Sequence, residues 1–295
     1  MQSNLFYGSG AALVTPFRGN RVDFDALENL IDWQIDSDTD ALIVLGTTGE
    51  PCTISDAERA AILECAVARC ARRTPLIAGV GSNDTRAAIR NAVEAQMLGA
   101  DALLVVTPYY NRASRQGLIE HFTAIADKVE IPIIMYNVPS RTGVNLEPRT
   151  VAELAKHPML CAIKDANTDS ALMSEMARLC GDGIAIYSGS DDCVLQAMAL
   201  GAHGVISVAA NVIPHEMHSL VMSWIRGDAK ACRNLQLEWL PLIRLLFSEV
   251  SPIPVKAALA MMGRIEDTLR LPLVPLAAAP REALRQEMKR RNLID

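Results

Sequence analysis

A lysine closes one of the short apolar runs of this chain, which is an unusual place for a charged side chain. The run LCAIK at 160–164 has the character of a buried strand and ends in Lys164. Burying an ammonium is costly, so a lysine at such a position is normally paired or kept neutral. A neutral amine is a nucleophile, and the position therefore predicts imine formation with a carbonyl substrate. The alternative is a strand-end lysine whose charge reaches water.

Other segments hold side chains that such a reaction would need. GTTGE at 46–50 offers hydroxyls and backbone N–H groups for an anion, although glycine and threonine also shape ordinary turns. Tyr136 could move protons or be a core aromatic, and Arg141 could bind a carboxylate or be a solvated loop charge. All of these residues end or follow apolar runs, as Lys164 does. Their shared position favours a single site with a lysine nucleophile, hydroxyls that move protons, and donors for carboxylates.

Eight short apolar runs rich in β-branched residues predict strands. They lie at residues 10–14, 41–45, 76–80, 102–106, 132–136, 160–164, 184–188 and 204–208. Helix signals separate several of them, such as the capping box of Ser55 and Glu58 and a segment that starts after Asp84 and stops at Gly99. Buried strands that alternate with helices predict an α/β fold with a parallel sheet, and eight units close into a (β/α)8 TIM barrel. An open doubly wound sheet is the alternative, but no GxGxxG follows the first run.

The pattern becomes wholly helical near residue 214. Residues 1–213 are therefore predicted to form the barrel core, and residues 214–295 the final barrel helix and a C-terminal helical extension. No linker rich in proline, glycine and serine separates the two parts, so we expect the extension to dock on the barrel. In a TIM barrel the carboxyl ends of the strands meet at one mouth, where the polar segments described above would converge.

Composition narrows the classes of function. The 295 residues are half hydrophobic and carry a formal charge of -6 without a long basic run, which argues against nucleic-acid and membrane partners. No apolar segment is long enough to span a bilayer and no signal peptide is visible, so we expect a cytoplasmic enzyme. The seven scattered cysteines are interpreted as reduced core residues. The five histidines form no metal-binding pattern.

Six segments together resemble the pyruvate-dependent class I aldolase family, which includes N-acetylneuraminate lyase, and within it the 4-hydroxy-tetrahydrodipicolinate (dihydrodipicolinate) synthases. The resemblance covers nearly the whole chain, and the segments occur in the family's order. They are GTTGE at 46–50, VTPYYN at 106–111, YNVPSRTG at 136–143, AIKDA at 162–166, AHGVIS at 202–207 and SPIPVKAAL at 251–259. Arg141 within NVPSRTG favours the synthase branch.

The resemblance implies a reaction and a role for each matching residue. Pyruvate would condense with L-aspartate-4-semialdehyde, with Lys164 forming the Schiff base and no separate cofactor. Tyr136 would transfer protons through Thr47 to Tyr110. Thr48, together with Thr47, would bind the pyruvate carboxylate, and Arg141 would bind the carboxylate of the second substrate. Gly189 and Ile206 would line the pocket.

The resemblance also implies an assembly, because the matching tyrosine of relatives crosses a subunit interface. Tyr110 would then complete the neighbour's relay in a homotetramer built as a dimer of dimers. Some positions depart from the family pattern. Asp165, Asn167, Thr168 and Ser190 differ near the lysine motif and bear on specificity.

Feedback by L-lysine is predicted to be weak or absent. In lysine-inhibited relatives the amino acid binds at the dimer interface, and Asn83 and Tyr109 match that pocket. Arg59 replaces its histidine and Ala87 its glutamate, which removes a partner for the lysine ammonium.

Two other functions stay open from the sequence. A lyase or aldolase of N-acetylneuraminate or a 2-keto-3-deoxy sugar acid would share Lys164 and Tyr136 but would need polyol contacts in place of Arg141. A non-catalytic barrel could bind a keto acid and retain the lysine only as an ion-pair partner.

Overall fold

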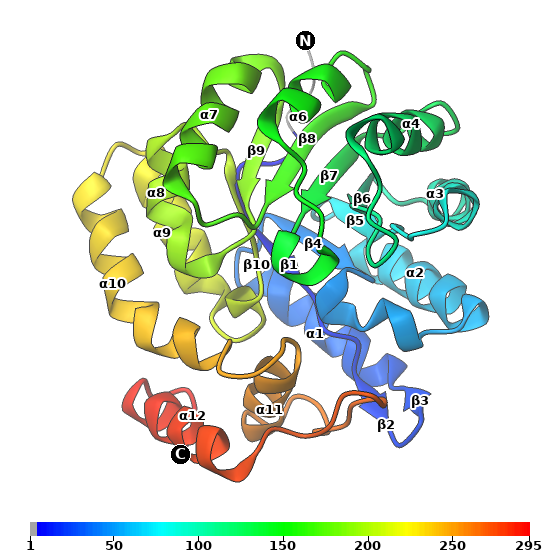
Figure 1. Cartoon of the computed structure of the whole chain (residues 1–295). Helices are drawn as coiled ribbons and strands as arrows, with labels where there is room; N and C mark the ends of the chain where they lie inside the picture. The colour runs from blue at the N-terminus through cyan, green and yellow to red at the C-terminus, as the bar shows by residue number, and fades with distance from the viewer. Residues whose placement is uncertain (1–4) are drawn as a thin grey trace.

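A computed structural model describes residues 5–295 and contains eight parallel strands closed into a barrel (Figure 1). The barrel strands are β1 (Gly8–Ala12), β4 (Ala41–Val44), β5 (Leu76–Gly79), β6 (Ala102–Val106), β7 (Ile133–Asn137), β8 (Leu160–Asp165), β9 (Ala185–Ser188) and β10 (Gly204–Ser207). Each strand pairs with its neighbours in chain order, and β1 closes the ring between β10 and β4. The predicted TIM barrel is confirmed, and the open doubly wound sheet is excluded.

Helices surround the barrel in the predicted alternation. The helices of four or more residues are α1 (Phe24–Asp36), α2 (Asp56–Cys70), α3 (Thr85–Leu98), α4 (Arg115–Ala126), α5 (Pro139–Thr142), α6 (Pro148–Leu154), α7 (Ser170–Cys180), α8 (Val194–Ala199), α9 (Pro214–Ile225), α10 (Ala229–Leu245), α11 (Ile253–Met261) and α12 (Ala278–Arg290). The capping box of Ser55 and Glu58 starts α2, and Asp84 caps α3, which ends at Gly99 in a left-handed conformation. These local signals were therefore sufficient to place both helix starts.

The first strand begins two residues before the predicted run. Gly8 pairs with Gly204, and a Cβ atom on Gly204 would lie 1.9 Å from the Gly8 carbonyl oxygen. Such a close approach of two backbones requires glycine, and small residues carry no apolar signal by which to recognise a strand. The short hairpin of β2 (Phe17–Arg18) and β3 (Arg21–Val22) also lacked such a signal and was not predicted.

Two apolar clusters fill the molecule. One lies inside the barrel and includes Ile43, Ile77, Ile134 and Tyr187, while the larger one packs the outer face of the strands against the helices. This arrangement follows from strands that bury both faces. Side chains that alternate along β8 therefore point in turn to the barrel interior and to the helices.

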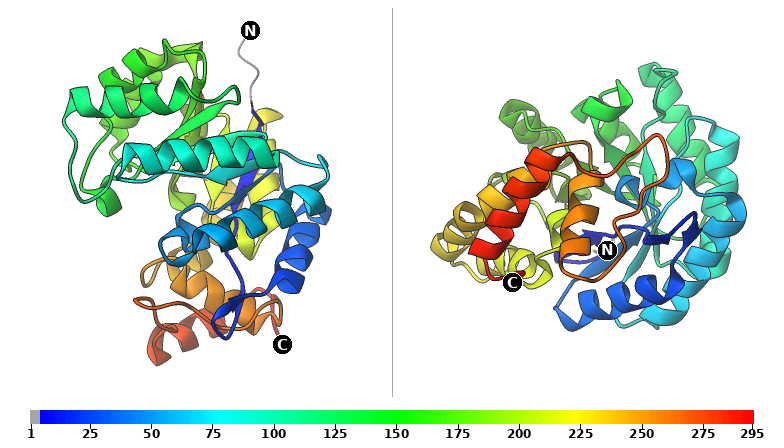
Figure 2. Two further views of the ribbon diagram at one scale, coloured as in Figure 1. Left: turned by 90° about the vertical axis from the view of Figure 1, so that its right-hand side faces the viewer. Right: turned by 90° about the horizontal axis from the view of Figure 1, so that it is seen from below.

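The extension lies at the end of the barrel where the strands finish. Figure 2 shows α11 and α12, in orange and red, side by side. The segment between them reaches the β2–β3 hairpin, where Arg270 donates hydrogen bonds to the backbone oxygens of Asn20 and Thr53. No helix within residues 5–295 is long and apolar enough to cross a bilayer. All seven cysteines are free. The core interpretation is wrong for Cys52, which is exposed, and for Cys193, which is half-buried outside the apolar clusters, whereas the half-buried Cys65 packs against the core.

Candidate active site

Lys164 and Tyr136 occupy matched positions on neighbouring strands. They are register partners in the β7–β8 pair, so both side chains enter the barrel mouth at the same level. Only 5% of Lys164 is exposed, and its Nζ lies 4.4 Å from the centroid of the Tyr136 ring. The amine is thus buried against the aromatic residue that was predicted to serve it.

A cavity of about 620 Å³ opens above this pair, and we call it the lysine cavity. Its volume suits a small-molecule substrate. It contains six of the eight predicted site residues, which are Thr47, Thr48, Tyr136, Arg141, Lys164 and Gly189. A second cavity of about 500 Å³, the side cavity, shares Thr47, Tyr136, Val138, Arg141 and Ser251 with it. The predicted convergence of strand ends on one mouth is therefore present.

The two threonines lie on a tight turn after β4. Thr47–Gly49 forms a single turn of 3-10 helix, and the hydroxyl of Thr15 donates to the Gly49 carbonyl at 2.8 Å. The turn is entered through Leu45 and left through Glu50, both with positive φ (57° and 56°). Residues other than glycine adopt this conformation only where the surroundings fix it, and such positions cluster at functional sites.

Arg141 lies on the short helix α5, within the segment that connects β7 to α6. The side-chain oxygen of Asn137 accepts from the Leu146 N–H at 2.9 Å, which ties the far end of the segment to the strand. The guanidinium donates to the Ser251 carbonyl oxygen at 3.1 Å, and Ser251 lines both cavities. Ser251 was quoted within a motif but given no role. Ser251 accepts this hydrogen bond through its backbone carbonyl oxygen, and the type of a side chain does not indicate such a contact.

Gly189 and Asp191 follow β9 at the rim of the lysine cavity. A Cβ atom on Gly189 would lie 2.8 Å from the Ala166 side chain, so glycine is required for the close approach of this loop to the one after β8. Asp191 was not predicted as a site residue. Its Oδ2 accepts from the backbone N–H groups of Val208 and Ala209, and burial raises the pKa of its carboxyl, while the hydrogen bonds and Lys164 oppose this.

Two predicted site residues lie outside both cavities. Tyr110 is 90% exposed, and its backbone has a φ of 71°. Ile206 is buried in the apolar cluster inside the barrel, where it packs with Tyr136 and Tyr187. Within one chain, Thr47 and Tyr136 therefore line the lysine cavity, whereas Tyr110 lies on the surface of the molecule.

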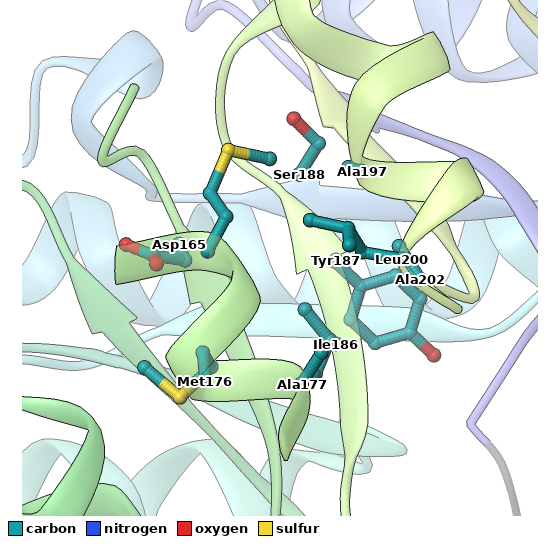
Figure 3. A pocket seen from close by; sticks show the side chains of 10 residues that line it. Asp165, Met176, Ala177, Ile186, Tyr187, Ser188, Ala197, Leu200 and Ala202 are labelled. Carbon is teal, nitrogen blue, oxygen red and sulfur yellow. The ribbon is translucent and has the colours of Figure 1, made fainter. Parts of the chain in front are cut away.

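The residues that depart from the family pattern divide between two faces. Asn167, Thr168 and Ser190 line the lysine cavity. Asp165 instead faces a small cavity of about 20 Å³ between the barrel wall and helices α7 and α8 (Figure 3). Burial raises the pKa of its carboxyl, against the hydrogen bonds from the Asn167 N–H and the Asn137 amide. Asp165 therefore joins the end of β7 to the loop after β8.

The side cavity holds most of the residues discussed for L-lysine. Arg59, Ala87 and Tyr109 line it, together with Arg90, whereas Asn83 is not among its lining residues. Within residues 5–295 there is no group of three or more histidine, cysteine, aspartate or glutamate side chains able to hold a metal ion.

The sequence profile of the Dihydrodipicolinate synthetase family matches residues 5–291. The chain belongs to this family. It is 48% identical over 290 residues to a 4-hydroxy-tetrahydrodipicolinate synthase of Alkaliphilus oremlandii, with 98% of this chain and all of that protein covered. It is 49% identical over 286 residues to the enzyme of that name from Caldicellulosiruptor bescii, with 97% of each chain covered.

Solved structures of the dihydrodipicolinate synthetase family share the fold over the same length. The chloride-inhibited dihydrodipicolinate synthase of Acinetobacter baumannii, crystallised with pyruvate, superposes with a TM-score of 0.96 at 42% identity. The match covers 98% of this chain and 99% of that one. The barrel and its extension are therefore both features of the family.

Proposed function

We propose that this chain condenses pyruvate with L-aspartate-4-semialdehyde to give 4-hydroxy-tetrahydrodipicolinate and water, a committed step toward diaminopimelate and lysine. The observation that carries the proposal is a buried lysine against a tyrosine ring, in a cavity that Thr47, Thr48 and Arg141 also line. The donors of these three side chains suit the carboxylates of the two substrates. The relatives named for this reaction support it. The enzyme is a lyase, and its covalent imine acts as the electron sink without a separate cofactor.

In the first half of the reaction Lys164 attacks the ketone carbon of pyruvate, and loss of water gives an imine. The protonated imine acidifies the methyl group, and loss of a methyl proton gives an enamine. Tyr136 moves protons at this centre and Thr47 links it to Tyr110, while Thr47 and Thr48 hold the pyruvate carboxylate. The pyruvate complex of the Acinetobacter relative supports this choice of keto acid.

In the second half the enamine carbon attacks the aldehyde carbon, and the aldehyde oxygen takes a proton to become a hydroxyl. The amine of the second substrate then attacks the imine carbon, which closes the ring and releases Lys164. Arg141 binds the carboxylate of this substrate, because its planar fork matches two carboxylate oxygens. Gly189 shapes the rim of the pocket through its backbone, whereas Ile206 packs in the apolar cluster inside the barrel, which also contains Tyr136.

The contacts around Lys164 and Arg141 argue against the two alternatives. A sugar-acid lyase needs polyol contacts where this chain has a guanidinium at the rim. In a keto-acid-binding barrel without catalysis, Lys164 would serve an ion pair, yet its amine lies over an aromatic ring. Both substrates of the proposed reaction carry a carboxylate, which suits the guanidinium of Arg141 at the mouth.

We infer a homotetramer, a dimer of dimers, in which Tyr110 reaches the relay of a neighbouring subunit. The exposure of Tyr110 supports this inference, because its ring lies outside both cavities of its own chain, whereas a relay tyrosine must reach an active-site cavity. We place the enzyme in the cytoplasm, where its partners are its small-molecule substrates and neither nucleic acid nor membrane.

A substrate profile tests the proposed reaction. The purified protein is incubated with pyruvate and L-aspartate-4-semialdehyde, and the product is consumed by a coupled reductase. In parallel, N-acetylneuraminate and a 2-keto-3-deoxy sugar acid are assayed for release of pyruvate. We expect turnover only in the first assay. Cleavage of either sugar acid at a comparable rate, with no condensation, would overturn the proposal.

A further inference from the structure

One lysine of the C-terminal extension is buried next to the turn of Thr47–Gly49, which we call the threonine turn. Lys256 lies on α11 and its side chain is 0% exposed. Its Nζ donates to Oε1 of Glu50 at 2.6 Å and to the carbonyl oxygen of Thr15 at 2.9 Å. The ammonium also lies 4.2 Å from the centroid of the Phe17 ring. A buried ammonium needs partners of this kind, and these come from the loops after β1 and β4.

Glu50 is the residue that ends the threonine turn. Its N–H donates to the Thr47 carbonyl oxygen at 3.2 Å, and its backbone has the left-handed conformation noted above. Oε1 accepts from Lys256, and Oε2 accepts from the Arg270 N–H at 3.3 Å. Both oxygens of the carboxylate are therefore held by residues of the extension, and Glu50 lines the side cavity but not the lysine cavity.

The same part of the extension also reaches the second carboxylate-binding group. Ser251 precedes α11 and accepts from the Arg141 guanidinium. The segment from Ser251 to Lys256 thus contacts Arg141 at one end. At the other end it contacts Glu50, which ends the threonine turn. Donors that bind a carboxylate must be held within a few tenths of an ångström to be effective, and rigid partners behind them supply that precision.

We propose that Lys256 is a positioning residue that acts through Glu50 to hold Thr47 and Thr48 where the pyruvate carboxylate binds. The inference rests on the proposed function, since it concerns the pyruvate half of that reaction. It differs from a purely structural role, in which the ion pair would stabilise the fold without any selective effect on pyruvate.

Three variants separate positioning from stability. Glu50→Gln keeps the shape of the side chain but removes its charge. Lys256→Met removes the ammonium. The double variant removes both charges together, which avoids an unpaired buried charge and so favours folding. In each folded variant we expect the KM for pyruvate to rise about tenfold or more, with the KM for the aldehyde changed less than about threefold. We expect kcat to fall as well, because Thr47 also belongs to the proton relay. Glu50→Asp, which keeps the charge, should recover part of the loss.

Leu284→Ala is the matched control for lost stability. Leu284 is buried on α12 in the same extension and lines neither cavity. This variant should melt at a lower temperature but keep the wild-type KM for pyruvate. The proposal is overturned if the folded double variant binds pyruvate as the wild type does, or if Leu284→Ala raises the KM equally. Failure of the wild type itself to react with pyruvate would instead reject the proposed function.

Discussion

Residues at the mouth are held by close neighbours, and two of these neighbours, Ser251 and Ala166, take no part in the reaction. Lys164 lies against Tyr136, Arg141 donates to the Ser251 carbonyl, and Gly189 permits close contact with Ala166. The chemical residues were recognisable from sequence because their types and their place at strand ends are unusual. Their supports were not, because a backbone carbonyl or a close approach leaves no chemical signature in the sequence.

Arg141 allows a prediction for one half of the reaction. Arg141→Lys keeps the charge but loses the planar fork, so two parallel hydrogen bonds to a carboxylate become one. We expect the KM for L-aspartate-4-semialdehyde to rise about 10- to 100-fold, as the loss of a charged hydrogen bond implies. Borohydride trapping of pyruvate should proceed at the wild-type rate. A variant with an unchanged KM for the aldehyde would remove Arg141 from its assigned role.

At the scale of elements, the strands and barrel helices follow from local patterns, whereas the links between distant segments do not. The capping box of Ser55 and Glu58 was readable because its residues are three apart. The ion pair of Glu58 with Arg270 joins residues 212 apart in the chain, and no sequence period predicts it. The extension was predicted as helical, but its contact with the threonine turn emerged only from the fold.

The ion pair of Glu58 and Arg270 should make stability acid-sensitive. The Arg270 guanidinium lowers the pKa of Glu58 from 4.5 to about 2, so the pair stabilises the fold fully above the ordinary pKa. This contribution is lost as the pH falls from about 4.5 towards 2. Glu58→Gln should cost about 1 kcal/mol at pH 7, because the pair is partly solvated. Urea unfolding should show this difference shrinking below pH 4.5. A constant difference would exclude the pair as its source, and Glu282→Gln serves as an exposed control.

At the scale of the whole molecule, one chain does not bring all residues of the proposed relay together. Tyr110 was assigned to the relay by resemblance, and in the structure it is exposed rather than in the lysine cavity. Single-sequence patterns predict which residues are buried within a chain, but not which surfaces face another copy. The position of Tyr110, the tetramer and the division of the chain at residue 213 therefore stay predictions.

Co-expression of two inactive variants tests whether Tyr110 acts across an interface. A Lys164→Ala subunit lacks the nucleophile, and a Tyr110→Phe subunit lacks the relay hydroxyl, which should lower turnover about 100-fold. In a mixed dimer, a tyrosine supplied by the neighbour restores one complete site. We expect activity well above either variant alone. If the tyrosine served its own subunit, mixing would restore nothing.

The side cavity predicts the response to L-lysine. Ala87 offers no carboxylate for a ligand ammonium, and the guanidinium of Arg59 at the same cavity would repel it. Steady-state turnover should therefore be unaffected by about 1 mM L-lysine. At this concentration a ligand occupies its site appreciably only if its binding free energy is more favourable than about -4 kcal/mol. The double change Arg59→His and Ala87→Glu should introduce inhibition. Inhibition of the wild type at micromolar L-lysine would contradict this reading of the cavity.

The covalent bond between pyruvate and Lys164 is the central claim, and borohydride trapping tests it most directly. The protein is incubated with pyruvate, reduced, digested and analysed by mass spectrometry, with Lys164→Ala treated in the same way. We predict one reduced pyruvyl adduct on Lys164, and no adduct or condensation in the variant. An adduct on a different lysine, or condensation that persists in Lys164→Ala, would contradict the account.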